Sequence, residues 1–396
     1  MMMDVLVVTP VWSGAAPIFF EGSSGESGMP AFVQPLKAAI ESSLRIRIVL
    51  LCSDEYYRKQ LNLAAWLDGV EITKIKYDSR SRLKGLLSLI QCYRYISKEI
   101  KCNRYSLMYA HGAASFFATV AARMANLKVG QRLYGSFLWS ALKNKGRTLA
   151  FIKYPLDYLS FLMKKEFMIV TDDGTGADLF VKSTFKNRPP YDFYYMQNGV
   201  EALQCDLNEV NDLAKGKYIF YPARITHWKR QDLAIELLKN FDSDVDLIFS
   251  GKEVDPSYSK ILRRKATEYG LNSRVHFLGE LTRVEVAYFM KNSLAVCAFY
   301  DVSAKGNVAL EAIAYGCVLI SLYGRGLDTL IEDGVSGILG GSVQECSDKA
   351  VRILCDEKEY ELMKKAALMS ASKKIESWPQ RVKVELDLIR EHGGDK

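Results

Sequence analysis

The stretch YIFYPARITHWKRQD, residues 218–232, contains one complete strand-to-helix junction. Tyr218–Tyr221 is an apolar run of β-favouring residues and predicts a buried strand. Pro222 closes the run, a polar turn follows, and we expect a helix to start at Lys229 with the residues Lys-Arg-Gln-Asp. A strand, a turn and a helix in this order form the repeating unit of parallel sheets with crossover helices.

The same alternation runs through both halves of the chain and is interrupted in the polar stretch Gly199–Gly216. Because 396 residues exceed what one hydrophobic core usually supports, we expect an α/β protein with two Rossmann-like domains, residues 1–200 and 201–375. The remaining residues, 376–396, predict a C-terminal helix that packs back on the first domain. The expected strands are Val5–Thr9, Arg47–Cys52, Val70–Ile75, Leu107–Ala110, Gln131–Tyr134, Phe167–Thr171, Phe193–Met196, Tyr218–Tyr221, Val245–Ser250, Val275–Phe277, Leu294–Ala298 and Val318–Ser321.

Composition favours a folded cytoplasmic protein. Hydrophobic residues make up 49% and charged residues 25% of the chain, as in ordinary globular domains. No apolar run approaches the roughly 18 residues of a membrane span, and the apolar start Val5–Val8 lacks the pattern of a cleaved signal. The eight cysteines are scattered without a Cys-x-x-Cys pair, which is typical of a reducing compartment.

Positive charge is concentrated in the first half of the chain. Residues 1–200 contain 26 Lys/Arg and 16 Asp/Glu, a net charge of +10, whereas residues 201–396 contain 27 and 30, a net charge of −3. This asymmetry indicates an anionic partner, either a nucleic acid or a membrane with acidic headgroups. Because the basic residues lack interleaved aromatic platforms and a recognition helix, we do not expect nucleic-acid binding.

The segment Arg80–Arg104 predicts a helix that combines an apolar side with many basic residues. Such a helix can dock on acidic lipid, with the basic residues Lys143, Lys145 and Arg147 adding to the charge of the same domain. Burial of the apolar side in the core of the domain explains the pattern equally well. The sequence leaves both interpretations open.

Two elements of the second half predict a site for a phosphorylated ligand. Arg224 and Lys229 flank the helix start after the strand Tyr218–Tyr221, where a doubly wound sheet binds ligands and a helix N-terminus favours anions. Gly306-Asn307 opens a second helix, on which Glu311 can accept hydrogen bonds from vicinal hydroxyl groups. By themselves these residues also fit a solvated basic loop and an exposed helical glutamate.

The order and spacing of these segments resemble the family-4 retaining glycosyltransferases of the GT-B fold. Besides Arg224, Lys229 and Glu311, the family pattern matches Phe277-Leu278-Gly279 at a strand end and Glu332-Asp333-Gly334-Val335-Ser336-Gly337 near its close. The resemblance covers Tyr218–Leu339 and is faint before it. It implies two Rossmann-like domains facing across a deep cleft.

The resemblance also implies roles for individual residues. Arg224 and Lys229 would hold the diphosphate of a nucleotide sugar, Glu311 its ribose, and the turn Gly279-Glu280 would border the base, with Gly306 and Asn307 near the phosphates. The family usually has a second Glu that contacts the donor sugar, and this position is Ser303 here. Either Asp301 supplies that carboxylate or Ser303 makes a weaker hydrogen bond.

On the N-terminal side the resemblance implies two further site residues. Gly14, in the Gly/Ser-rich loop that runs from Thr9 through Gly28, lies where family members approach the donor, although their double glycine is absent here. His111 closes a predicted strand where the family has a histidine that faces the reacting sugar. The alternatives are that Gly14 belongs to a mobile surface loop and that His111 is structural. Tyr134 ends the next predicted strand and either borders the acceptor or packs in the core.

We expect no metal or other cofactor. Asp172-Asp173-Gly174 suggests the metal-binding carboxylates of the other glycosyltransferase fold class, but the pair opens a predicted helix, where aspartates are ordinary caps. Arg224 and Lys229 already supply positive charge to a leaving diphosphate. No His/Cys cluster has the spacing of a zinc site.

The sequence therefore predicts a retaining glycosyltransferase (hexosyltransferase). It would use a UDP- or GDP-sugar and a glycan or lipid-linked acceptor, in surface polysaccharide or lipopolysaccharide biosynthesis, at the inner face of the cell membrane. Arg224, Lys229 and His111 would be its catalytic residues. Two alternatives remain: a non-catalytic nucleotide-sugar binding subunit, and a nucleotide-sugar epimerase of the same architecture.

Overall fold

The computed structural model describes residues 3–24, 29–42, 44–78, 82–201, 203, 216–324 and 326–394, without the side chains of Arg82 and Leu83. Most of the predicted boundary Gly199–Gly216, residues 25–28 of the predicted loop, Arg80 and Cys205 lie outside the described residues. The chain divides into two compact units. The first comprises Met1–Asp172, Gly176–Gln197 and Trp378–Lys396, and the second comprises Asp173–Thr175 and Asn198–Ser377.

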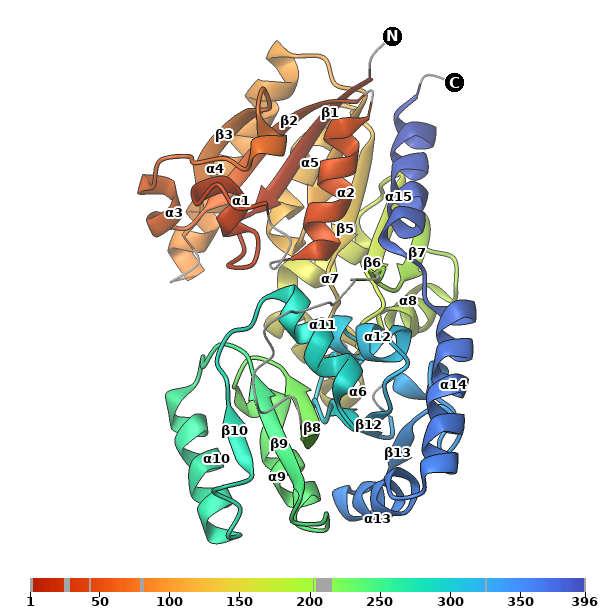
Figure 1. The fold of residues 1–396 in the computed structure, drawn as a ribbon. Helices are drawn as coiled ribbons and strands as arrows, with labels where there is room; N and C mark the ends of the chain where they lie inside the picture. Colours follow the sequence, from red (N-terminus) through yellow and green to blue (C-terminus); the bar gives the residue numbers. More distant parts are fainter. Residues whose placement is uncertain are drawn as a thin grey trace. The chain divides into compact units, whose positions relative to one another are not determined.

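The first unit is built on a seven-stranded parallel sheet with the order β3-β2-β1-β4-β5-β6-β7 (Figure 1). Its strands are β1 Met3–Pro10, β2 Leu44–Cys52, β3 Glu71–Lys76, β4 Leu107–His111, β5 Val129–Leu133, β6 Phe167–Thr171 and β7 Asp192–Met196. Its helices are α1 Ala16–Phe20, α2 Pro30–Glu41, α3 Asp54–Arg58, α4 Arg82–Cys102, α5 Phe116–Met124, α6 Leu138–Lys153, α7 Pro155–Leu162, α8 Ala177–Phe185 and α15 Trp378–Gly393.

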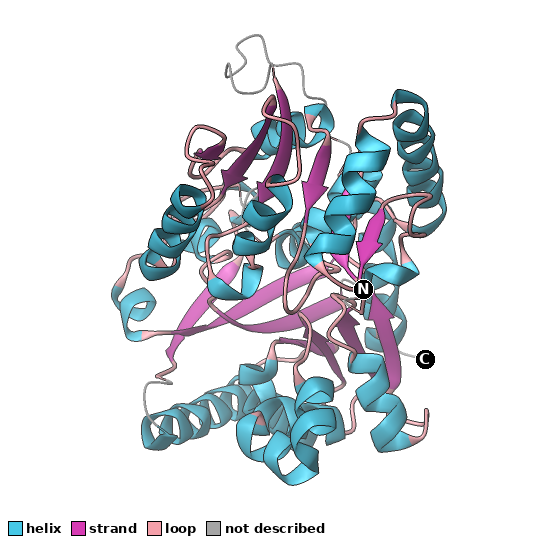
Figure 2. Cartoon of the chain, turned by 90° about the horizontal axis from the view of Figure 1, so that it is seen from below, coloured by secondary structure: helices cyan, strands magenta, loops and turns pink. Residues whose placement is uncertain are grey.

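Strand β1 shows why a continuous apolar run suits this fold. Val5 and Val7 face a core that contains residues of α2 and of the C-terminal helix α15, whereas Leu6 and Val8 face a core that contains residues of α4 and α5. Both faces of the strand are therefore buried, as expected for a parallel sheet covered by crossover helices. Figure 2 shows the strands flanked by helices in this way.

The second unit contains a six-stranded parallel sheet with the order β10-β9-β8-β11-β12-β13. Its strands are β8 Lys217–Pro222, β9 Val245–Ser250, β10 Val275–Phe277, β11 Ala295–Cys297, β12 Leu319–Leu322 and β13 Ile338–Gly340. Its helices are α9 Gln231–Leu238, α10 Pro256–Glu268, α11 Arg283–Asn292, α12 Asn307–Ala314, α13 Val343–Leu354 and α14 Glu357–Lys374. One core cluster of this unit gathers residues from all six strands.

Each of the twelve expected strands has a counterpart in the structure, and β13 was missed because its apolar run is only Ile338-Leu339 between glycines. Two local expectations are wrong. Lys229 does not start a helix; it ends the 3-10 turn His227–Lys229, and α9 begins at Gln231 after Arg230 in a left-handed conformation. Asp172 and Asp173 are not helix caps, because α8 begins at Ala177.

Helix α4 occupies the predicted amphipathic segment, and its apolar side is largely used within the first unit. Cys92 and Ile96 are buried in a core cluster with α5, Leu89 is also buried, and Leu86 and Leu87 stay exposed. Core packing thus explains most of this helix. Among the residues whose structure is described, none of the helices combines the length and the apolar character that crossing a bilayer requires.

Candidate nucleotide-sugar site

The order of strands in the second unit indicates where a ligand is expected to bind. The chain leaves β8 towards β9 on one side and returns to β11 on the other, so the carboxyl ends of β8 and β11 form the topological switch point where such sheets bind ligands. The loop after β8 carries Arg224 and Lys229, and the loop after β11 leads to Ser303, Gly306 and α12.

Tyr221 connects these two loops. Its buried hydroxyl group donates to the carbonyl oxygen of Lys229 and accepts a hydrogen bond from the amide of Phe299 at 3.0 Å. The amide of Asp301 in turn donates to the carbonyl oxygen of Trp228 at 2.9 Å. Hydrogen bonds within the protein therefore hold the loops after β8 and β11 together at the switch point.

Lys229 lies on two aromatic rings instead of a carboxylate. Its Nζ atom is 3.3 Å from the ring centroid of Tyr300 and 4.2 Å from that of Trp228. Burial, and secondarily the positive charge of Arg224, lowers the pKa of Lys229 to about 7. An anion bound here would stabilise the charged form of this lysine, and the exposed side chain of Arg224 provides a second cation nearby.

Glu311 faces the same region from α12. Its carboxylate is one of the charges that raise the pKa of the buried Tyr300 hydroxyl, after burial itself and Cys297. Burial raises the pKa of Glu311 to about 7, although Arg283, whose Nη2 atom lies 3.7 Å from Oε1, opposes this shift. Arg283 also pairs with Glu201 at 3.0 Å. Lys229 and Glu311 thus both lie near Tyr300, and Arg224 lies near Lys229.

The start of α12 is shaped by Gly306, Asn307 and Ser303. Gly306 is the N-cap, and a Cβ atom there would lie 3.2 Å from the carbonyl oxygen of Ser303, tighter than ordinary contact. Asn307 accepts a hydrogen bond from Asn198 at 2.7 Å. Ser303 has a left-handed φ of 54° and donates to Asp173 at 2.8 Å. Backbone amides at this helix start are available to an anionic ligand.

Gly279 and Glu280 line a separate pocket of about 300 Å³ at the ends of β9 and β10. The pocket includes Phe277, whose ring carries the Arg263 guanidinium 4.1 Å from its centroid. Gly251 is required in its wall, because a Cβ atom there would lie 2.5 Å from the carbonyl oxygen of Ala223. The glycine lets the loops after β8 and β9 approach each other closely.

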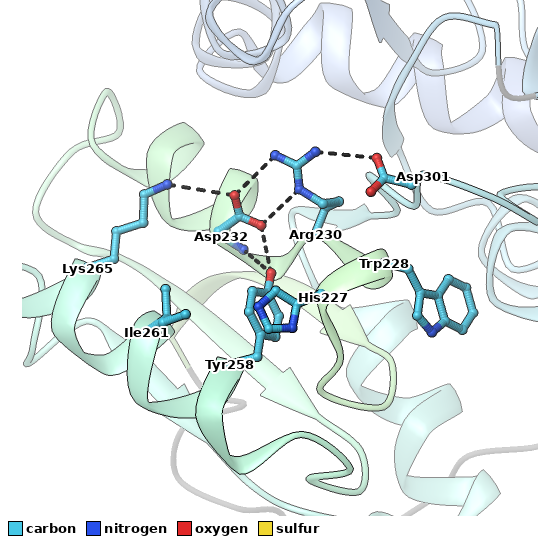
Figure 3. Close-up of a pocket in the computed structure, with 8 residues that line it drawn as sticks. All are labelled: His227, Trp228, Arg230, Asp232, Tyr258, Ile261, Lys265 and Asp301. Atoms are coloured by element: carbon cyan, nitrogen blue, oxygen red, sulfur yellow. Dashed lines mark hydrogen bonds and ion pairs between the residues drawn. The ribbon is translucent and has the colours of Figure 1, made fainter.

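A second pocket of about 490 Å³ lies beside this site and contains an ion-pair cluster (Figure 3). Asp232 is flanked by Arg230 at 3.1 Å and Lys265 at 3.9 Å, and it accepts a hydrogen bond from Tyr258 at 2.6 Å. Arg230 also reaches Asp301 at 3.3 Å. Asp301, the alternative carboxylate for sugar recognition in the sequence analysis, therefore pairs with Arg230.

In the first unit, the same topological rule singles out the ends of β1 and β4. Gly14 lies in the turn after β1, and His111 is the last residue of β4. The two loops touch, because a Cβ atom at Gly112 (φ 69°) would lie 2.9 Å from the Trp12 ring. His111 is buried, and its Nδ1 atom is 2.7 Å from the Tyr134 hydroxyl oxygen.

A buried polar network lies next to His111. The guanidinium of Arg132 pairs with Glu385 of α15, and both side chains are fully buried. Glu385 also accepts a hydrogen bond from Tyr109 at 2.5 Å and lies 3.3 Å from Arg381. Burial, and secondarily the charge of Arg132, lowers the pKa of His111 to about 3.

We expect His111 to stay unprotonated from about pH 8 down to about pH 5. The measurement is the pH dependence of imidazole ¹⁵N shifts, with the His111 signals identified by their loss in His111→Gln. A midpoint near the unperturbed 6.5 would contradict the burial. Unfolded chains bind this proton below about pH 6.5, whereas the folded protein binds it only near pH 3. Between these values, each fall of one pH unit should lower the free energy of unfolding by up to about 1.4 kcal/mol because of His111.

Sequence reasoning missed several residues of these sites. Tyr300 and Arg283 carry no motif, and Gly251 stands out only when the approach of Ala223 is known. The strand end before Gly251 was a usable signal, since a glycine directly after a buried strand often marks a close backbone approach. The pairing of Arg132 with Glu385 had no local signal at all.

Comparisons with known proteins agree with this architecture. Residues 206–369 match the family model described as glycosyl transferases group 1. The D-inositol 3-phosphate glycosyltransferase of Kribbella flavida is 30% identical over 124 residues, which are 31% of this chain and 28% of that protein. The matched stretch thus spans less than a third of that relative's length.

Two solved structures extend the likeness over nearly the whole chain. Anabaena HepE in complex with UDP and glucose is 17% identical, with a TM-score of 0.68 over 97% of this chain and 99% of that chain. The apo form of the lipopolysaccharide outer core galactosyltransferase WaaB is 15% identical, with a TM-score of 0.69 over 98% and 99%.

The two parallel sheets and these likenesses define the class: the chain has the GT-B fold, as the sequence predicted. Within this class, the part of the chain that contains Arg224, Lys229 and Glu311 matches the glycosyl transferases group 1 family model. The resemblance is confirmed at this level, and membership of family 4 stays a prediction.

Proposed function

We propose that this protein is a retaining glycosyltransferase that moves a sugar from a nucleotide-diphosphate donor to a glycan or lipid-linked acceptor. The observation that carries the proposal is the gathering of Arg224, Lys229 and Glu311 at the topological switch point of the second unit. Cations at such a point suit a diphosphate, and a carboxylate on the adjoining helix suits a ribose.

Each group has a defined task in this proposal. Lys229 and Arg224 stabilise the negative charge that develops on the leaving diphosphate, assisted by the amides at the start of α12. Glu311 accepts hydrogen bonds from two ribose hydroxyl groups, and the Gly279–Glu280 pocket receives the base. The family resemblance gives His111 a place facing the transferred sugar, where a neutral imidazole can donate or accept a hydrogen bond.

The match to the group-1 family model and the structural neighbours support a nucleotide-sugar donor. HepE binds UDP, and WaaB is a lipopolysaccharide galactosyltransferase. By analogy, we infer that this chain uses a UDP-sugar and an acceptor in surface polysaccharide or lipopolysaccharide biosynthesis. A cytoplasmic protein that works at the inner face of the cell membrane fits this chemistry.

The proposal predicts a donor-dependent transfer reaction. Calorimetry of the full chain with UDP and with GDP should show binding of one of them, and a panel of labelled UDP- and GDP-sugars should label a membrane-derived acceptor fraction. The anomeric configuration of the product, read by NMR, should equal that of the donor. An inverted product would refute the retaining mechanism, and the absence of nucleotide binding would refute the site.

One observation favours a second candidate, a non-catalytic nucleotide-sugar binding subunit. Ser303 stands where the family has the sugar-binding Glu, and its hydroxyl group donates to Asp173. For this candidate, calorimetry would show nucleotide binding while no labelled sugar is transferred or hydrolysed. Consumption of the donor without an acceptor would instead indicate an epimerase or a hydrolase.

A further inference from the structure

Helices α6 and α7 of the first unit present large apolar side chains to solvent. Leu149 is 51% exposed, Phe151 41%, Ile152 57% and Leu162 44%. The two helices form one surface, because the ring of Phe151 packs edge-on against that of Tyr158 at 5.7 Å. Leu162 follows Tyr158 by one helical turn. We call these four residues, with the exposed cations described below, the α6–α7 patch.

The apolar side chains of this patch are not needed by the core of the unit. Ala150, Ser160 and Phe161 are buried and fill the inward side of the two helices. Gly146, whose φ of 75° is not helical, interrupts α6 before these residues. The last two turns of α6 therefore carry their own inward residue and a separate outward apolar surface.

Positive charge surrounds the exposed apolar residues. Residues 138–165 contain six Lys/Arg and a single carboxylate, Asp157, whose pKa is raised by burial. Lys165 is buried and donates to Gln131. The other five cations are exposed, and none of them pairs with a carboxylate within the described part of the chain: Lys143, Lys145, Arg147, Lys153 and Lys164.

Aromatic residues lie where the apolar and basic parts of the patch meet. Lys153 lies over the Tyr154 ring at 5.1 Å, and Tyr154 stacks on Phe137, which is 44% exposed. A protein surface that lies in a membrane interface has three features: apolar side chains that enter the acyl region, aromatic rings at its border, and cations around them. A protein partner would have to supply several carboxylates at these positions.

We propose that the α6–α7 patch docks the first unit on a membrane surface that carries anionic phospholipid headgroups. Leu149, Phe151, Ile152 and Leu162 enter the interface, and the five exposed cations contact the headgroups. This inference stands apart from the proposed transfer reaction, since it depends on residues outside the nucleotide-sugar site. It also moves the membrane contact away from α4, whose apolar side lies largely in the core.

The test is co-sedimentation of the full chain, without nucleotide sugar, with phosphatidylcholine vesicles that contain or lack phosphatidylglycerol. The unaltered protein should bind the anionic vesicles and should dissociate as salt is raised. The triple variant Lys143→Gln, Lys145→Gln, Arg147→Gln should bind about 100-fold more weakly. The double variant Leu149→Ser, Ile152→Ser should lose at least about tenfold.

Two matched variants serve as controls. Leu362→Ser with Met369→Ser removes two similarly exposed apolar residues of α14, 57% and 62% exposed, in the second unit. Leu86→Ser with Leu87→Ser removes the exposed leucines of α4. Both should leave vesicle binding unchanged, and thermal unfolding should be similar in all variants because every altered side chain is exposed.

Several results would overturn the proposal. These are equal binding to vesicles without phosphatidylglycerol, an equal loss in the α14 control, or no binding by the unaltered protein. Loss of binding in the α4 variant alone would place the docking surface on α4. A dimer that the Leu149→Ser, Ile152→Ser variant dissociates, measured by sedimentation without lipid, would show that the patch is covered by a second copy of the chain.

Discussion

Replacement of Lys229 with methionine is expected to lower the rate of sugar transfer by about 100- to 1,000-fold. The Nζ atom rests over the rings of Tyr300 and Trp228 in a half-buried position, where no described carboxylate pairs with it. Its charge therefore acts on a bound diphosphate with little screening. Affinity for the nucleoside diphosphate should fall by about 10- to 100-fold, measured by calorimetry.

The matched control is Lys239→Met. This lysine also lies over an aromatic ring, that of Tyr269 at 4.2 Å, but it is exposed at the end of α9, away from the switch point. It should leave both binding and turnover unchanged. If Lys229→Met behaves like Lys239→Met, then Lys229 does not contact the diphosphate.

The same site predicts an optimum of donor binding near neutral pH. Lys229 binds a diphosphate when it is protonated and Glu311 binds a ribose when it is ionised, and both groups have a pKa of about 7 without ligand. Binding of a UDP-sugar, whose diphosphate does not titrate in this range, should weaken as pH rises above 7 and also as it falls below. Lys229→Met should remove the alkaline decline and Glu311→Gln the acidic one.

The second large effect is on stability. Replacement of Glu385 with alanine is expected to destabilise the first unit by about 3–5 kcal/mol, because the fully buried Arg132 loses its carboxylate while Arg381 stays next to it. Tyr109 would also lose the acceptor of its hydroxyl group. Urea unfolding followed by tryptophan fluorescence measures this difference.

Two further variants make this prediction specific. Asp387→Ala removes a carboxylate of the same helix that pairs with Arg390 at 3.7 Å on the surface, and it should cost less than about 1 kcal/mol. Arg132→Met combined with Glu385→Leu removes the charges of the Arg132–Glu385 pair but leaves the buried Arg381 without its carboxylate, so it should recover only part of the lost stability. A small loss in Glu385→Ala would mean that water reaches the guanidinium.

The sequence by itself determined the class of fold and predicted where in it a donor site lies. Strands such as Tyr218–Tyr221 could be recognised because apolar runs, turns and helix periodicity are local properties of the chain. Arg224, Lys229 and Glu311 could be proposed because they follow strand ends that meet at one edge of a parallel sheet, and because their order and spacing resemble the family pattern. Strand β13 could not be recognised in this way, because only its first two residues, Ile338 and Leu339, are apolar and glycines flank them.

Only the tertiary structure decided which side chains meet across long stretches of sequence. Glu385 pairs with Arg132 although 253 residues separate them, and Arg283 approaches Glu311 from another helix. The sequence left open whether the apolar side of α4 is core or surface. Packing against α5 buries most of it, whereas α6 and α7 expose large apolar residues in addition to their buried side. Apolar periodicity shows that a face exists, but burial depends on whether another element covers it, which is a property of the folded chain.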